Sequence, residues 1–161
     1  GSVARTADSC VRTLGSEFSA TAGTVVVAGR ASGGQDAAAA QFVYNFDDGT
    51  TNERIGLTRP PGSDAASHRI VDGGALQTLL DGTFTSSTTF KSAHAFSLND
   101  VAVSVNGGAV LSDTGVTLPT VTGLALGHQI AVDVVKMNGH ILRFDYWPTR
   151  QTNAFLVSAS T

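Results

Sequence analysis

The chain is poor in charge, in lysine and in long apolar runs. Charged residues make up 14% of its 161 residues, against roughly 25% in an average soluble protein. Only Lys91 and Lys136 are lysines, and the eight arginines form no basic stripe. We therefore expect no nucleic-acid partner. No stretch approaches the roughly 20 apolar residues of a membrane-spanning helix, so we also expect no membrane insertion.

Cysteine and glutamate are scarce as well. The single cysteine, Cys10, cannot form an intrachain disulfide or a cysteine-based metal site, and we expect it to be a small buried apolar residue. Glu17 and Glu53 are the two glutamates. No basic segment followed by an apolar one indicates a signal peptide. We expect residues 1–2 to be a cloning scar and residues 3–161 to form one domain.

Glycine, serine and threonine are abundant, and they punctuate short β-branched or alternating runs. The hydrophobic fraction of 42% suffices for a packed core. Runs of this kind, separated by turn residues every 8–12 positions or so, are typical of an antiparallel sandwich. The expected strands cover 24–30, 41–46, 52–58, 68–71, 76–80, 89–97, 101–105, 109–111, 124–127 and 137–147. Only 36–41 and 152–158 are compatible with a helical turn, and Thr152 could cap the second.

The side-chain alternation makes finer predictions. Phe42, Tyr44 and Phe46 should share one face of their strand. Residues 137–147 alternate imperfectly, which indicates a β-bulge. Arg54 and Arg59 are five positions apart on one strand, so they should point to opposite faces.

The C-terminal third carries the most specific pattern. Its first part is the run 99–108, followed by the pairs Asp113-Thr114 and Leu118-Pro119. Its second part is the expected strand at 124–127 and the segment 138–150, which begins Asn138-Gly139-His140-Ile141 and includes Tyr146-Trp147-Pro148. This pattern resembles the concanavalin A-like lectin/glucanase superfamily, in its laminin-G-like jelly-roll branch. The resemblance is greatest to domains of bacteriophage and prophage tail and virion proteins. More loosely, residues 5–8 resemble the family's first strand and 48–57 its central hairpin.

The resemblance implies an all-β, two-sheet antiparallel jelly-roll β-sandwich that binds a partner without catalysing a reaction. We expect a carbohydrate-binding or host-receptor-binding module of a phage tail fibre or other virion protein. Such a module would recognise bacterial surface polysaccharide on the outside of the particle, and would be a homotrimer if the parent is a fibre. The alternative is a structural or decoration domain that binds other virion proteins. A glycoside hydrolase is disfavoured, because the two glutamates do not form the carboxylate pair that such enzymes use.

Candidate site residues follow from exposed polar and aromatic positions. Polar side chains on a concave sheet and its loops could contact sugar, and the candidates are Asn45, Asp48, Arg54, His94 and Trp147. The indole of Trp147 could stack on a sugar ring, or instead anchor the end of its strand. No cofactor is expected apart from a calcium ion, for which the candidates are Asp47, Asp48 and Asn52. A hairpin turn with solvated acids explains the same residues equally well.

Overall fold

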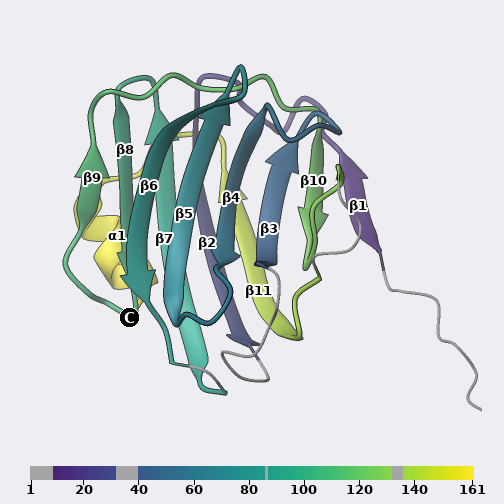
Figure 1. Cartoon of the computed structure of the whole chain (residues 1–161). Coiled ribbons are helices and arrows are strands. Elements are labelled where there is room, and N and C mark those ends of the chain that lie inside the picture. The colour runs from purple at the N-terminus through teal and green to yellow at the C-terminus, as the bar shows by residue number, and fades with distance from the viewer. Residues whose placement is uncertain (1–8, 32–39, 86, 132–135) are drawn as a thin grey trace, which may run out of the picture.

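Two antiparallel β-sheets pack face to face in the computed structural model, which describes residues 9–31, 40–85, 87–131 and 136–161 (Figure 1). The strands are β1 (Cys10–Thr13), β2 (Ala22–Ala31), β3 (Gln41–Asp47), β4 (Arg54–Arg59), β5 (Ala65–Asp72), β6 (Ala75–Thr83), β7 (Thr89–Ser97), β8 (Asp100–Val105), β9 (Leu111–Asp113), β10 (Gly123–Leu126) and β11 (Gly139–Trp147). One helix, α1 (Asn153–Ala159), follows β11. No helix in the described ranges is long and apolar enough to cross a membrane.

The six-stranded sheet has the order β1-β10-β3-β4-β5-β6, and the five-stranded sheet has the order β11-β2-β7-β8-β9. Strands that neighbour each other in space are often remote in sequence. β10 inserts between β1 and β3, and β2 lies between β7 and β11. This crossed connectivity confirms the predicted two-sheet antiparallel sandwich and defines two solvent-side faces, one on each sheet.

Most sequence-based expectations are confirmed. Each predicted strand overlaps an observed one, and the bulge predicted near the end of the chain lies between Ile141 and Arg143. Two are wrong. The register of β3 shifts between Phe42 and Tyr44, so Val43 and not Phe42 joins the core cluster. Cys10 is exposed, at the start of the edge strand β1, whose four residues are all exposed. Of the predicted helical turn at 36–41, residues 36–39 lie outside the described residues and Gln41 begins strand β3 instead. The proposed first strand at 5–8 also lies outside the described residues.

Aromatic side chains from both sheets fill the space between them. Phe46 contacts Phe18, Phe144 and Tyr146, with ring centroids 5.3, 6.4 and 5.9 Å away. The core cluster consists of Val25, Val27, Ala31, Val43, Tyr44, Phe46, Ile55, Leu57, Ala66, Ile70, Phe84, Phe90, Phe96, Val101, Val105 and Val116. Because these residues alternate along their strands, the intervening residues point away from the core.

Two histidines are buried within this core. Tyr44 Oη lies 2.8 Å from His94 Nδ1, and His68 Nε2 lies 2.5 Å from Ser92 Oγ. The two imidazole rings are 5.2 Å apart. Burial lowers the pKa of His68 to about 4, and burial followed by the charge of His68 lowers the pKa of His94 still further below its usual range. Both histidines are therefore neutral in the folded protein at neutral pH.

These histidines predict loss of stability in mild acid. In the unfolded chain they titrate near pH 6.5, whereas the folded pKa values are lower, so their contribution is present above pH 6.5 and is lost as the pH falls toward 4. We expect His68 to contribute about 2 kcal/mol of lost unfolding free energy between pH 7 and 5, and His94 to add a loss in the same direction. Urea denaturation at several pH values measures it. The variant His140→Gln, at an exposed histidine, should keep the same pH dependence, and a flat profile in both proteins would contradict the assignment.

Helix α1 covers part of the outer face of the five-stranded sheet. Leu156 is fully buried against a cluster of small residues, Val26, Ala93, Ala95 and Ala102, which let the helix approach closely. As predicted, Thr152 caps the helix, with its Oγ1 accepting a hydrogen bond from the N–H of Phe155 at 3.2 Å.

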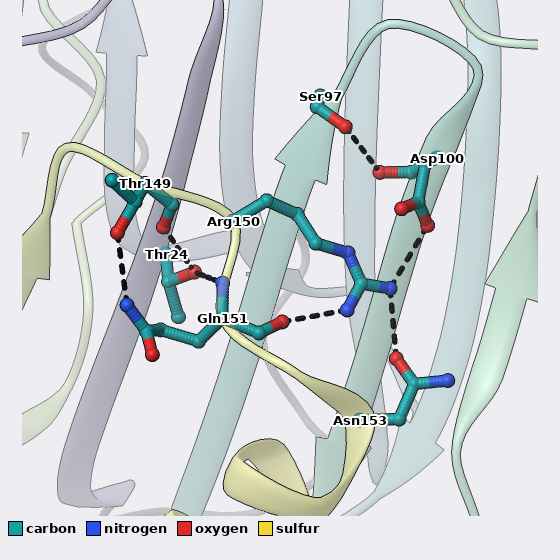
Figure 2. A network of polar contacts seen from close by, with 7 residues as sticks. All are labelled: Thr24, Ser97, Asp100, Thr149, Arg150, Gln151 and Asn153. Carbon is teal, nitrogen blue, oxygen red and sulfur yellow. Dashed lines mark hydrogen bonds and ion pairs between the residues drawn. The ribbon is translucent and has the colours of Figure 1, made fainter.

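The link between β11 and α1 is held by a polar network (Figure 2). Arg150 Nη2 donates to Asp100 Oδ1 at 2.9 Å and to Asn153 Oδ1 at 2.7 Å. The hydroxyl of Thr24 donates to the carbonyl of Thr149 at 2.8 Å and accepts from the N–H of Gln151 at 2.9 Å. The network therefore fixes the position of α1 through β2 and the start of β8.

The substitution Leu156→Ala should lower the unfolding free energy by about 3 kcal/mol, because it leaves a cavity under α1. Chemical denaturation measures the loss. The control Leu98→Ala removes a leucine that is 63% exposed and should change stability by less than about 0.5 kcal/mol. Equal effects of the two substitutions would show that α1 does not pack as described.

Candidate functional site

The outer face of the six-stranded sheet carries the candidate site. Ile55 and Leu57 of β4 point into the core, so Arg54 and Gly56 point outward. The same alternation places Asn45 of β3 and Arg69 of β5 on this face, on either side of Gly56. Leu79 of β6 lies opposite Arg69. We call these five residues, Asn45, Arg54, Gly56, Arg69 and Leu79, the arginine face.

In the part of the chain that the structure describes, no carboxylate forms an ion pair with either arginine of this face. Arg54 and Arg69 are diagonal neighbours on adjacent strands, and both are partly buried. Neither guanidinium makes a hydrogen bond or ion pair with any described residue, and the Nε atoms of both are buried without a partner. Burial, followed by the positive charge of Arg69, lowers the pKa of Arg54, while the carboxylate of Asp47 acts in the opposite direction. Two like charges are thus held close together and partly out of water.

Asp47 does not neutralise Arg54 by contact, because its carboxylate is already occupied. Its oxygens accept hydrogen bonds from Asn45 Nδ2 at 2.5 Å, from the N–H of Gly49 at 2.9 Å and from the N–H of Ile130 at 3.1 Å. The amide of Asn45 is oriented by this bond. Its Oδ1 is buried and has no hydrogen-bond partner, and the residue as a whole is closed off from solvent.

Gly56 leaves space between Asn45 and Arg69. A Cβ at this position would lie 2.7 Å from Asn45 Oδ1 and 2.8 Å from the carbonyl oxygen of Tyr44. Both distances are shorter than real Cβ atoms adopt. The glycine, which is itself buried, therefore lets the side chain of Asn45 lie close over β4.

The segment 127–130 covers the adjoining part of the sheet, over β10 and β3. His128 and Gln129 are buried, and Ile130 packs over Gly123. The amide nitrogen of Gln129 is buried without a partner. This segment shields Asn45 and Asp47 from solvent, whereas Arg54 and Arg69 remain partly exposed.

The structure brings together two of the five predicted sugar contacts, Asn45 and Arg54. Arg54 and Arg59 point to opposite faces, as predicted, and Arg59 is held by the carbonyl of Ser63 and the carboxylate of Asp64. Asp48 lies outside the face, in the exposed loop between β3 and β4, where it accepts hydrogen bonds from the N–H and hydroxyl of Thr50.

The predicted placements of His94 and Trp147 on a sugar-binding surface are wrong. His94 is 1% exposed and lies between the sheets, because β7 alternates with His94 facing the core. Trp147 lies on the other sheet, where its ring packs against Phe155 of α1 with centroids 5.2 Å apart. The alternative prediction for Trp147, an anchor at the end of its strand, is confirmed.

The residues predicted to bind calcium do not converge. Asp47 is fully buried and bound by three donors, while Asp48 and Asn52 are exposed in the following loop. Across the ranges that the structure describes, no cluster of three or more His, Cys, Asp or Glu side chains could hold a metal ion. The turn interpretation describes Asp48 correctly, with its carboxylate capping Thr50.

Sequence reasoning missed Arg69 and Gly56. A signal was present, since Arg69 stands between the inward-facing residues His68 and Ile70. Pro60-Pro61 separates β4 from β5 and gives no sequence signal of the hairpin between them, whose register places Arg69 opposite Gly56. The pairing of Arg54 with a second arginine could not be seen without that register.

The overall fold is similar to that of several carbohydrate-binding proteins. The CBM40 of the Ruminococcus gnavus IT-sialidase, bound to α2,3-sialyllactose, superposes with a TM-score of 0.74 at 14% identity, covering 89% of this chain and 84% of that one. The leech intramolecular trans-sialidase gives 0.70 at 13% identity, covering 88% of this chain and 23% of that one. Chicken galectin 2 gives 0.50 at 12% identity, covering 77% and 88%. These likenesses show a lectin-like jelly-roll fold. No family model and no curated protein sequence matches the chain.

Removing either unpaired arginine should not destabilise the protein. Arg54→Gln and Arg69→Gln each relieve like-charge repulsion, and we expect the unfolding free energy to rise by about 0.5 kcal/mol. The control Arg150→Gln removes the bonds to Asp100 and Asn153 and should cost about 2 kcal/mol. Urea denaturation of the three variants measures whether the unfolding free energy rises for Arg54→Gln and Arg69→Gln and falls for Arg150→Gln. A loss for Arg54→Gln as large as that for Arg150→Gln would show that Arg54 has a structural partner.

Proposed function

We propose that this chain is a non-catalytic carbohydrate-binding module whose ligand lies on the arginine face. The observation that carries the proposal is a pair of guanidinium groups on one sheet face, those of Arg54 and Arg69, which the fold holds together with their Nε atoms buried and unpaired. Buried polar groups without partners are rare in folded proteins, and a bound ligand is one way to satisfy them. Hydroxyl groups of a saccharide supply both donors and acceptors for such groups.

The fold supports this proposal. Solved structures with a similar fold include a sialidase CBM40 bound to sialyllactose and a galectin. In the chain described here, Leu79 adds an apolar contact at the edge of the arginine face, and it is 46% exposed. Apolar side chains beside polar ones suit a sugar ring, which has both C–H surfaces and hydroxyl edges.

The two glutamates support binding without catalysis. Glu53 accepts hydrogen bonds from the N–H groups of Gly73 and Thr120, and Glu17 forms an ion pair with Arg12. Both carboxylates thus hold loops together, and neither lies on the arginine face. A glycosidase of the usual kind needs two carboxyl groups flanking the scissile bond.

The biological setting follows from the sequence resemblance to phage and prophage tail and virion domains. We propose that the module is displayed on a virion and recognises bacterial surface polysaccharide. Single contacts of this kind are weak, and several copies on one particle, three in a trimeric fibre, would raise the apparent affinity by multivalency. The alternative, an assembly domain that binds virion proteins, receives less support, because the exposed leucines Leu76, Leu79, Leu98, Leu111 and Leu142 are spread over both sheets.

A pair of leucine substitutions tests which face binds. Leu79→Glu places a negative charge beside Arg69 and should abolish binding on an array of bacterial surface glycans. The matched control Leu142→Glu alters a leucine on β11 of the other sheet, 64% exposed, and should bind like the unchanged protein. Thermal denaturation confirms that both variants fold. Binding that survives Leu79→Glu but not Leu142→Glu would move the site to the opposite sheet, and an array without any hit would favour the assembly role.

A further inference from the structure

We propose that the ligand is an acidic saccharide and that its carboxylate lies between the guanidinium groups of Arg54 and Arg69. The inference rests on the proposed function and deepens it by assigning the chemical class of the sugar. It starts from two neighbouring positive charges that no carboxylate pairs with among the described residues.

The first step concerns what the two arginines lack. A partly buried guanidinium normally forms hydrogen bonds with a carboxylate or with backbone carbonyls. Burying any of its five N–H donors without a hydrogen-bond acceptor costs free energy. Arg59 and Arg150 follow this rule, since each donates to an aspartate. Arg54 and Arg69 depart from it together, side by side, with both Nε atoms buried and unpaired.

The second step concerns the carboxylates nearby. The carboxylate of Asp47 is occupied by Asn45, Gly49 and Ile130. Asp81 is on the same side of the sheet as Arg69, one pair further along β6, but it is exposed and forms no ion pair with that arginine. An anion that enters from solvent would therefore meet two donors with free positions and would relieve their mutual repulsion.

The third step concerns the shape of the anion. A planar carboxylate presents two oxygens that match the fork of a guanidinium, and it can bridge two such groups. Beside the arginines, Leu79 lies opposite Arg69 and offers an apolar contact. A sugar acid provides both features in one molecule: a carboxylate and C–H surface.

The test compares each acidic ligand with its uncharged, carboxyl-reduced derivative. The full chain is titrated by calorimetry with α2,3-sialyllactose and with oligogalacturonate, and then with the carboxyl-reduced form of each. We expect at least one acidic ligand to bind, with at least about tenfold weaker affinity after reduction. Arg54→Gln and Arg69→Gln should each weaken binding by about tenfold or more, because each removes a charged hydrogen bond. The control Arg30→Gln makes the same charge change at an exposed position on β2 and should leave the affinity within about twofold.

The remaining outcomes separate this inference from the proposed function. Equal binding of the acidic and reduced ligands, unaffected by the arginine substitutions, would overturn the carboxylate assignment and leave carbohydrate binding intact. Dextran sulfate serves as a control for unspecific attraction of anions. If it binds as tightly as the sugar acid, and binds Arg30→Gln and Arg54→Gln equally well, the carboxylate assignment is overturned as well. Failure of the acidic and reduced ligands and of all glycans on the array would overturn both proposals.

Discussion

The aromatic packing between the two sheets is the constraint on which everything else in this protein depends. Because Tyr44, Phe46 and their neighbours must face inward, the period-two geometry of a strand sends the residues between them to the opposite side. Asn45, Arg54 and Arg69 are therefore on the outer face as a consequence of core formation. The polar surface and the apolar core are specified by the same alternation, and a slip of one residue in β4 or β5 would exchange them.

The arginine face is stabilised by its surroundings and gains nothing from its own contacts. Strand pairing fixes the backbone under both arginines, and the bond from Asn45 to Asp47 orients the amide. Repulsion between the guanidiniums is offset by the packing of the strands that carry them. Natural binding sites commonly retain such unfavourable arrangements, because a group satisfied within the protein has less to gain from a ligand.

The sequence alone predicts the sandwich and its last strand well, and the site only in part. Alternation and turn residues are local signals, and they are sufficient for the strands, for the bulge in β11 and for the cap at Thr152. Placement of side chains on a shared face depends on register. His94 shares the alternation of Phe90 and Phe96, so the period of β7 already places it inward, and β7, the central strand of its sheet, points it at Tyr44. Arg69 becomes visible as a partner of Arg54 only when β4 and β5 are paired.

The position of β2 has a consequence for how the protein reaches its folded state. This strand lies near the start of the chain, but its two neighbours are β7, some sixty residues later, and β11, which ends at Trp147. Closing such distant pairs costs chain entropy before any contact repays it, so folding should be slow for the size of the protein. During synthesis both edges of β2 stay unpaired until β7 has left the ribosome, and one edge stays unpaired until β11 has followed. Pairing of this exposed strand with another nascent chain is then the main route to misfolding and aggregation.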